Sequence, residues 1–403
     1  MGKSSISALR SRVGSAPLRD LVQCCCLPLA NAQDHPQTFY AGLRLVALDA
    51  SIFELPDEAD NAHSFGYSGS RTSVAGHAGY PHARCAVLVE CATHAILGAN
   101  LGPYRTGEWE LTTPLLARLV LGMLCMAARG LNGFEHWRQA QAAGAELLWR
   151  CSSTRQLPVQ RVLDDGSFLS VIRPTGVGRA QAAEQAITVR VIEYALPGLD
   201  DAQPRYRLLT TLLYPQLAPS MELAALYHQR WEIEAVFDEL KTHLRQSRRV
   251  LRSKTPQLVR QEFYGWVLAH YAVRWLLHQG ATRHRVPHAE LSFKGHVELL
   301  RRTQPQSGAF PPERPRRRRR WFRELLQASA RTRATRTLNR RSPRVVQRRN
   351  SRYAPRDRSA PTRVAKGCTP CALTEPPCTP TPRAARIRTH LWSPTNPLGS
   401  FVI

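Results

Sequence analysis

The sequence predicts a mixed α/β body followed by a basic C-terminal tail. Three observations predict it. Short apolar runs typical of buried strands alternate with amphipathic segments, a β-rich stretch interrupts this alternation, and two long helical segments close the body. Of the 403 residues, 43 % are hydrophobic, which is enough for one large core or two modest ones.

The positive charge is concentrated near the C-terminus. The formal net charge is +26, with 56 Lys and Arg residues against 30 Asp and Glu residues. Residues 301–403 hold 25 basic and 4 acidic residues, whereas residues 1–300 hold 31 and 26. This composition excludes an acidic disordered protein. It favours a polyanionic partner, because clustered cations release counterions from a phosphate backbone.

Several classes of protein and site are not indicated. No run approaches the ~20 apolar residues of a membrane helix, and the short segment Leu21–Ala30 lacks the features of a signal peptide. Without an export signal, the ten cysteines are expected to be free thiols. Cys368, Cys371 and Cys378 lack a fourth zinc ligand at suitable spacing, so we expect no zinc there. No Gly-rich phosphate-binding motif is present, so no nucleotide cofactor is implied.

In the first half of the body, apolar runs and turn residues define the elements. Residues 56–82 lack periodicity and are rich in Gly, Ser, Asp, His and Pro, so we expect a loop. The expected helices are Ser5–Val22, Thr113–Leu119 and Gly133–Ala143. The expected strands are Leu43–Leu48, which Asp49 follows, Ala86–Glu90 and His94–Ala99 as a hairpin, Leu121–Ala127, and Glu146–Cys151.

The second half changes character twice. Between about 152 and 213 the pattern predicts strands at Val159–Val162, Phe168–Ile172, Ile187–Tyr194 and Tyr206–Leu213. Long helices are expected at Met221–Arg245 and Pro256–Leu277. From about Gln304 the apolar period is lost, five arginines follow at Arg316–Arg320, and we expect residues 359–403 to be disordered.

The helix predicted at Met221–Arg245 carries a polar stripe. At ~100° per residue, its Tyr227, Arg230, Glu234 and Lys241 fall within about 60° of one another. An apolar face lies directly beside them. By geometry alone, an ordinary amphipathic helix with an Arg–Glu pair four residues apart is the favoured explanation.

The order Tyr-x2-Arg-x3-Glu-x6-Lys resembles the signature of the insertion-sequence-4 family of DDE transposases. Other blocks resemble the same family, and together the likeness covers about residues 5–355. The blocks are Leu43–Asp49 with Phe53–Pro56, Val87–Ala95, Gly102–Glu108, Gly144–Arg150 with Asp165–Ser167, and Ser342–Arg349.

The resemblance implies an RNase H-like, retroviral-integrase-like catalytic core in which two Asp and one Glu hold two Mg²⁺ ions for phosphoryl transfer on DNA. By position, Asp49 matches the first Asp and Glu234 the Glu, as catalytic residues and metal ligands. Tyr227, Arg230 and Lys241 would contact DNA.

The resemblance also divides the chain. The expected parts are an N-terminal helical remnant (1–40), the first part of the core (41–151), a β-rich insertion (152–215), the C-terminal helices of the core with the Tyr-Arg-Glu-Lys motif (216–300), and a basic, largely disordered tail (301–403).

The chain departs from the family pattern at the second Asp. The family has Asp-Arg-Gly-Phe after a buried strand, whereas this chain has Ala128 followed by Arg-Gly-Leu131. Alanine cannot bind a metal, so we expect little or no transposition activity. The segment Ser5–Leu18 resembles one that follows an N-terminal DNA-binding region in the family. Here the chain begins almost at that segment, so we expect a truncated copy.

Three hypotheses remain open from the sequence. The chain is a crippled transposase of this family, a non-catalytic DNA-binding remnant, or a basic nucleic-acid-binding protein that acts through its tail. The first implies the inverted repeats of double-stranded transposon DNA as partner, a homodimer in a synaptic complex, no membrane, and a nucleoid-associated place in the bacterial cytoplasm.

Overall fold

A single mixed sheet organises the part of the chain that the structure, a computed structural model, describes. The described residues are 3–68, 79–131, 133–195, 206–245, 250–304 and 315–334. The strands among them are β1 (Phe39–Tyr40), β2 (Leu43–Glu54), β3 (His82–Glu90), β4 (Ala95–Pro103), β5 (Met123–Ala127), β6 (Glu146–Arg150), β7 (Arg161–Val162), β8 (Phe168–Ile172), β9 (Ile187–Tyr194) and β10 (Tyr206–Thr210).

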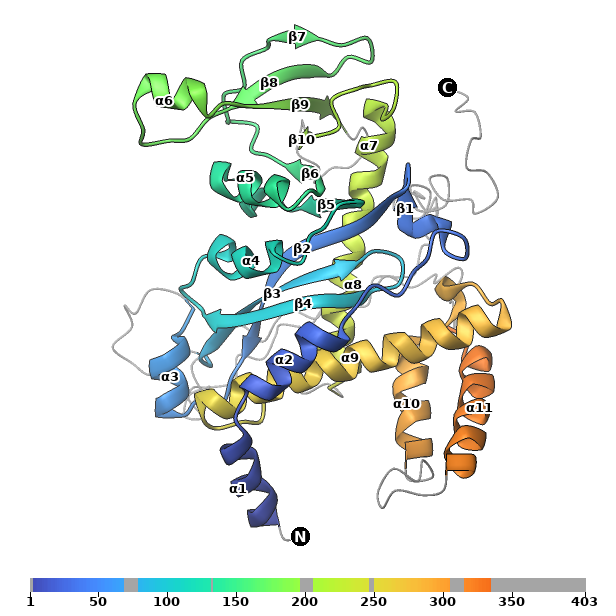
Figure 1. Ribbon diagram of the computed structural model, residues 1–403. Coiled ribbons are helices and arrows are strands. Elements are labelled where there is room, and N and C mark those ends of the chain that lie inside the picture. The colour runs from blue at the N-terminus through green and yellow to red at the C-terminus, as the bar shows by residue number, and fades with distance from the viewer. Residues whose placement is uncertain are drawn as a thin grey trace, which may run out of the picture. The chain divides into compact units, whose positions relative to one another are not determined.

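The strand order is β4-β3-β2-β5-β6-β10-β9-β8-β7, with β1 paired to β2 (Figure 1). Strands β2, β5 and β6 are parallel to one another. The hairpin β3–β4 is antiparallel and pairs antiparallel with β2, as do β10 with β6 and the strands beyond β10. The sheet therefore has a parallel centre between two antiparallel wings.

Helices cover both faces of this sheet (Figure 1). The helices of the described residues are α1 (Lys3–Val13), α2 (Ala16–Cys25), α3 (Ala59–Phe65), α4 (Glu108–Leu116), α5 (Phe134–Ala142), α6 (Arg179–Glu184), α7 (Ser220–Tyr227), α8 (Glu232–Asp238), α9 (Pro256–His284), α10 (Phe293–Thr303) and α11 (Pro315–Arg331). Shorter turns are η1 (Pro36–Thr38), η2 (Arg129–Leu131), η3 (His228–Trp231), the π-helical η4 (Glu239–His243) and η5 (His288–Glu290).

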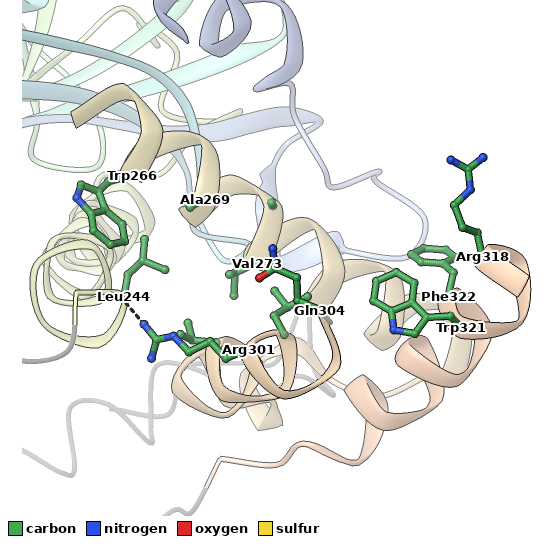
Figure 2. Close-up of a pocket in the computed structure, with 12 residues that line it drawn as sticks. Leu244, Trp266, Ala269, Val273, Arg301, Gln304, Arg318, Trp321 and Phe322 are labelled. Atoms are coloured by element: carbon green, nitrogen blue, oxygen red, sulfur yellow. Dashed lines mark hydrogen bonds between the residues drawn. The ribbon is translucent and has the colours of Figure 1, made fainter. Parts of the chain in front are cut away.

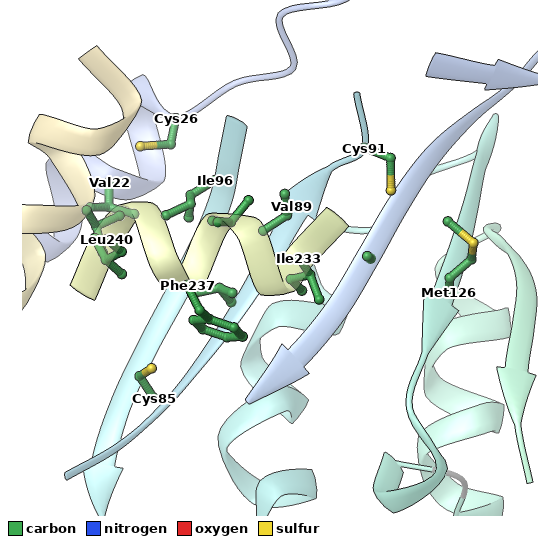
Figure 3. Close-up of a cluster of buried hydrophobic side chains, with 14 of the residues drawn as sticks. Val22, Cys26, Cys85, Val89, Cys91, Ile96, Met126, Ile233, Phe237 and Leu240 are labelled. Carbon is green, nitrogen blue, oxygen red and sulfur yellow. The ribbon is translucent and has the colours of Figure 1, made fainter. Parts of the chain in front are cut away.

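The alternation of side chains along β2 sends its apolar residues to two cores. Leu45, Ala47 and Phe53 join the core under α7, α8 and α9, while Val46 and Leu48 join the core under α4 and α5. Figure 3 shows the first core, in which the apolar face of α8 meets the sheet and α2. The apolar face predicted for Met221–Arg245 is confirmed, since all its members are buried: Leu226, Ile233, Phe237, Leu240 and Leu244.

Strand β2 is longer than the sequence predicts. We expected it to end at Leu48, but its pairing with β3 continues from Val46 opposite Glu90 to Glu54 opposite His82. Asp49 therefore lies in the middle of a strand instead of after one. Hydrogen bonding to a long antiparallel neighbour stabilises a polar segment that has no apolar run of its own.

The β-rich stretch between β6 and α7 extends the main sheet. The predicted strands Phe168–Ile172 and Ile187–Tyr194 are confirmed with these bounds, and the strand predicted at Tyr206–Leu213 ends earlier, at Thr210. β10 joins this stretch to the core by pairing Leu209 with Trp149.

Two helical predictions and one loop prediction need correction. The single helix expected at Ser5–Val22 is two helices that meet at Gly14, whose φ of 70° a helix cannot continue through. The expected loop at 56–82 contains α3. The helix expected at Met221–Arg245 is α7 and α8, joined by the 3₁₀ turn η3 and followed by the π turn η4.

The basic tail is folded in its first part. No periodic element was expected after about Gln304, yet α11 contains the arginines of Arg316–Arg320. Its Leu325 and Leu326 pack on Leu276 of α9 and Leu299 of α10, which explains the order. The arginines themselves are exposed on the first turns of this helix.

Two expectations lie outside the described residues: the disorder of 359–403 and the absence of zinc at Cys368, Cys371 and Cys378. Among the helices that the structure describes, none combines the length and apolar character needed to cross a membrane.

Candidate active site

The register of the three parallel strands sets three side chains beside one another. Leu48 of β2 pairs with Ala127 of β5, and Ala127 pairs with Trp149 of β6. Continuing this register by one residue gives the row Asp49–Ala128–Arg150, in which Ala128 directly follows the last paired residue of β5. Parallel strands lie about 4.8 Å apart. A residue at position 128 is therefore the direct neighbour of Asp49 on the face of the sheet that α7 and α8 cover.

Asp49 is held by an arginine from the opposite layer. Its Oδ2 accepts a hydrogen bond from Nη1 of Arg230 at 2.6 Å, and its Oδ1 accepts one from the backbone N–H of Ala50 at 2.8 Å. The side chains of Asp49 and Arg230 are 14 % and 9 % exposed. This charge-assisted pair joins the sheet to the η3 turn.

Tyr227 ties the same helical stretch to the end of β5. Its hydroxyl donates to the backbone carbonyl of Ala127 at 3.2 Å, one residue before Ala128. The residue is 3 % exposed. Burial raises the pKa of Tyr227, so it stays a neutral donor at physiological pH.

Lys241 reaches β2 one alternation further along, at Ser51. Its ammonium donates to the Ser51 hydroxyl and lies over the rings of Phe53 and Phe237, 5.5 and 5.4 Å from their centroids. Lys241 belongs to the π turn η4, a kind of irregularity that is frequent at functional sites. The extra residue of this turn makes the regular 100° spacing, from which the stripe was predicted, only approximate here.

Glu234 lies on α8 between Arg230 and Lys241 and is exposed. It follows Arg230 by four residues, close to one helical turn. The structure thus brings Asp49, Tyr227, Arg230 and Lys241 to one side of β2. Glu234 lies on the same stretch with its carboxylate open to solvent.

A second carboxylate on this stretch has a different environment. Glu239 is 7 % exposed and accepts hydrogen bonds from Nε2 of His270 at 3.0 Å and from Nε and Nη2 of Arg274. Burial alone would raise the pKa of Glu239, but the charge of Arg274 and the hydrogen bond from His270 hold it well below 4.5. Its acceptor sites are occupied, and Glu239 has a structural role.

The donor set near Asp49 fits a pair of divalent ions poorly. In the described ranges, no group of three His, Cys, Asp or Glu side chains forms around Asp49. The position beside it is the methyl group of Ala128, and Asp49 is already paired with Arg230. A two-metal site needs several carboxylate oxygens that are free to coordinate.

Sequence reasoning missed Arg150 and Ser51. Arg150 continues the row of Asp49 and Ala128, and its guanidinium lies 4.5 Å from the ring centroid of Tyr206. Burial, with the charges of Arg150 and Arg230, lowers the pKa of nearby His228.

A large apolar cavity lies elsewhere, between α9, α10 and α11 (Figure 2). Its volume is about 810 Å³, and Trp266, Trp321 and Phe322 supply much of its lining. Arg301, at its edge, donates to the backbone carbonyl of Leu244 at 2.9 Å. None of the residues of the Asp49 site lines it.

A family model and two curated relatives point to one family. The family model described as "Transposase DDE domain" matches residues 40–272, more than half of the chain. The chain is 28 % identical over 277 residues to "Transposase InsG for insertion sequence element IS4" of Escherichia coli (strain K12), covering 68 % of this chain and 60 % of that protein. It is 30 % identical over 124 residues to "Putative transposase InsZ" of the same strain, covering 30 % of this chain and 39 % of that protein.

A solved structure of the piggyBac transposase synaptic complex with hairpin DNA aligns with a TM-score of 0.40 and 11 % identity, over 71 % of this chain and 57 % of that one. A likeness of this size carries no argument. The chain spans less than two thirds of the length of the InsG and InsZ relatives. The family match covers the strands and helices that carry Asp49, Ala128, Arg230 and Glu234, and the chain belongs to the transposase DDE domain family.

Proposed function

We propose that this chain acts on DNA as a transposase of the insertion-sequence-4 type, with its strand-cleavage chemistry suppressed at Ala128. The observation that carries the proposal is the row Asp49–Ala128–Arg150 at the centre of the sheet. In that row, a methyl group stands where the family has its second aspartate. DNA binding is then expected to persist while cleavage is lost.

The fold supports an RNase H-like core. The support is the strand order β4-β3-β2-β5-β6, in which an antiparallel wing adjoins the parallel strands β2, β5 and β6. The strands β7 to β10 follow β6 in sequence and precede α7. This position in the chain supports the β-rich insertion that we propose before the Glu-bearing helix.

The catalytic metal of the family is a divalent ion, proposed here to be Mg²⁺. In an intact site it would be held by Asp49, Glu234 and a second aspartate. Because Ala128 offers no ligand, we derive no cleavage step for the chain as it stands. An aspartate at position 128 would restore a carboxylate next to Asp49 on the same face of the sheet.

Phosphate contacts are supported by the cations that border the row. Arg230 and Lys241 approach β2 from the helical layer, and Arg150 comes from the sheet itself. A guanidinium binds phosphate through two parallel hydrogen bonds, while an ammonium acts as a point charge. The exposed arginines of Arg316–Arg320 add sequence-independent attraction to a duplex. We propose transposon inverted repeats as the DNA and a pair of chains as the synaptic unit.

The test compares three proteins on DNA that carries the element's own inverted repeats. These are the unmodified chain, Ala128→Asp, and Ala128→Asn as a control of similar size that supplies no charge. We expect the Asp variant to cleave more than about a hundredfold faster than the others in Mg²⁺, because it regains a metal ligand. All three should bind the DNA without metal and with strong salt dependence.

Two results would contradict the proposal. Full cleavage by the unmodified chain would show that Ala128 does not suppress the chemistry. Salt-sensitive binding that survives only in fragments of the basic tail, and never in the body, would favour a nucleic-acid-binding protein that acts through its tail.

A further inference from the structure

Three histidines gather where the N-terminal segment crosses α9. His35 precedes the turn η1, His278 lies in the last turns of α9, and His288 begins η5. One ring nitrogen of each lies within 4.8 Å of the corresponding nitrogens of the other two. In the described part of the chain, no other group of three potential metal ligands comes this close. The rings lie 4.6 to 4.9 Å apart between centroids.

The polar atoms of this cluster lack good partners. His35 and His278 are 2 % and 5 % exposed. Nδ1 of His278 and Nε2 of His288 are buried without any hydrogen-bond partner. Buried polar atoms are nearly always satisfied, so two unsatisfied nitrogens that share one small space require an explanation.

The two ring nitrogens of His35 make only long contacts. The backbone N–H of Asn31 donates to its Nδ1, and its Nε2 lies near the hydroxyl of Thr282, both at 3.4 Å. If Nδ1 binds a ligand in place of the Asn31 N–H, Nε2–H can still donate to Thr282. A ligating histidine commonly donates its second ring N–H in this way.

The three imidazoles are neutral at physiological pH. Burial lowers the pKa of His35, and burial with the neighbouring histidines lowers that of His278 to about 4 and that of His288 to about 3. Neutral imidazoles have a free lone pair, so no proton has to leave before a metal binds.

We propose that His35, His278 and His288 bind a zinc ion that fastens the N-terminal segment to α9. Imidazole suits Zn²⁺, whereas Mg²⁺ prefers oxygen ligands. With Zn–N distances of about 2.0–2.1 Å, tetrahedral geometry needs nitrogens about 3.4 Å apart. Side-chain rotations that shorten the distances between the three ring nitrogens by about 1.4 Å or less would therefore bring them to tetrahedral zinc geometry. A water molecule would take the fourth position.

The zinc ion would add to the hydrogen bonds that already hold residues 27–30 to the body. The hydroxyl of Tyr271 on α9 bonds the backbone N–H and carbonyl of Leu27, and Glu90 accepts the backbone N–H groups of Leu29 and Ala30. After these contacts, His35 would be the last anchor before β1 and β2 begin. Figure 1 shows α2 lying along α9 ahead of this segment. The proposed site shares no residue with the Asp49 site, so it stands or falls independently of the proposed function.

The test uses the full chain without an affinity tag, in excess Mg²⁺ so that oxygen-rich sites do not take up zinc. Bound zinc is measured by elemental analysis after gel filtration, and the melting temperature is measured with and without zinc. We expect one zinc per chain and a rise in Tm of about 3 °C or more. Cobalt in place of zinc should give d–d absorption without thiolate charge-transfer bands, because the ligands are imidazoles.

Matched variants assign the ligands. His288→Gln changes the least buried of the three ligands and should weaken zinc binding at least tenfold, as should His35→Gln. His284→Gln, exposed and on the same helix as His278, should bind like the parent. The triple variant Cys368→Ser, Cys371→Ser, Cys378→Ser should also keep the zinc.

The proposal is overturned if the parent binds no zinc, if His288→Gln binds as tightly as His284→Gln, or if the cysteine variant loses the metal. If a histidine variant does not fold, the cobalt spectrum of the parent decides: thiolate bands would refute the site.

Discussion

Two carboxylate–arginine pairs border the helical stretch from Ser220 to His243, and they differ in how completely the carboxylate is satisfied. Glu239 is buried and receives hydrogen bonds from His270 and from two nitrogens of Arg274. Asp49 accepts hydrogen bonds only from Arg230 and from the adjacent backbone N–H, and its side chain is 14 % exposed.

The contrast separates a structural carboxylate, Glu239, from Asp49, which we propose to be functional. Arg274 also donates to Nδ1 of His94 at 2.6 Å, so the Glu239 cluster joins α9 and η4 to the turn between β3 and β4. A saturated acceptor of this kind has no free lone pairs for a new ligand. Asp49, with partial exposure and few donors, retains the capacity to bind a cation or to exchange its arginine.

The largest expected effect comes from breaking the saturated cluster. Glu239→Gln should lower the free energy of unfolding by about 3–5 kcal/mol, because it leaves the buried guanidinium of Arg274 without its counter-charge. Denaturant titration followed by circular dichroism measures this. Glu234→Gln is the matched control on the same stretch, and its exposed side chain should change stability by less than about 0.5 kcal/mol. Equal effects of the two substitutions would remove the distinction drawn here.

Acid should reduce the difference between the parent and Glu239→Gln. The pKa of Glu239 is held well below its unfolded value of 4.5, so the charged form stabilises the fold above pH 4.5. That contribution is lost as the pH falls below 4.5 toward the folded pKa, where both proteins carry a neutral side chain. Unfolding titrations at pH values from ~7 down to ~3 measure the difference. A gap that stays constant with pH would show that packing, not charge, explains the effect.

A smaller effect is expected at the unsaturated pair. Arg230→Gln should cost about 1–3 kcal/mol of stability, since Asp49 keeps some access to water. It should also weaken DNA binding uniformly across sequences and lower the salt slope by about one, if Arg230 contacts a phosphate. Salt-dependent binding assays test this. The exposed Arg316→Gln should weaken binding without changing stability by more than about 0.5 kcal/mol. An unchanged salt slope for Arg230→Gln would show that Asp49 alone uses this arginine.

The sequence pattern predicted elements whose own residues favour them. It failed where strand pairing or packing against other elements determined whether a segment is ordered and where it ends. The strand Ile187–Tyr194 was predicted with its bounds because it is rich in β-branched residues. The end of β2 was not, because residues 49–54 are held by pairing with β3. The helix containing Arg316–Arg320 was missed because its apolar residues, such as Leu325 and Leu326, are too few to show a period against so many arginines.

The site was predictable in composition but not in arrangement. The spacing of Tyr227, Arg230, Glu234 and Lys241, with Asp49, pointed to one polar edge, and the structure brings Arg230 and Lys241 to β2 and Tyr227 to the end of β5. The sequence could not show that Asp49 is paired with Arg230. It also could not show that η4 is a π turn, since both depend on how the helical layer fits the sheet.

By itself, the sequence determined the family, the mixed α/β class and the alanine at position 128. These follow from residue types at fixed spacing and from apolar periodicity, which are local properties of the chain. Only the tertiary structure decided that Asp49, Ala128 and Arg150 form one row, because strand register is fixed between segments about 80 residues apart. In the same way, it alone brought His35 to His278 and His288, whose separation in the sequence carries no metal-ligand pattern.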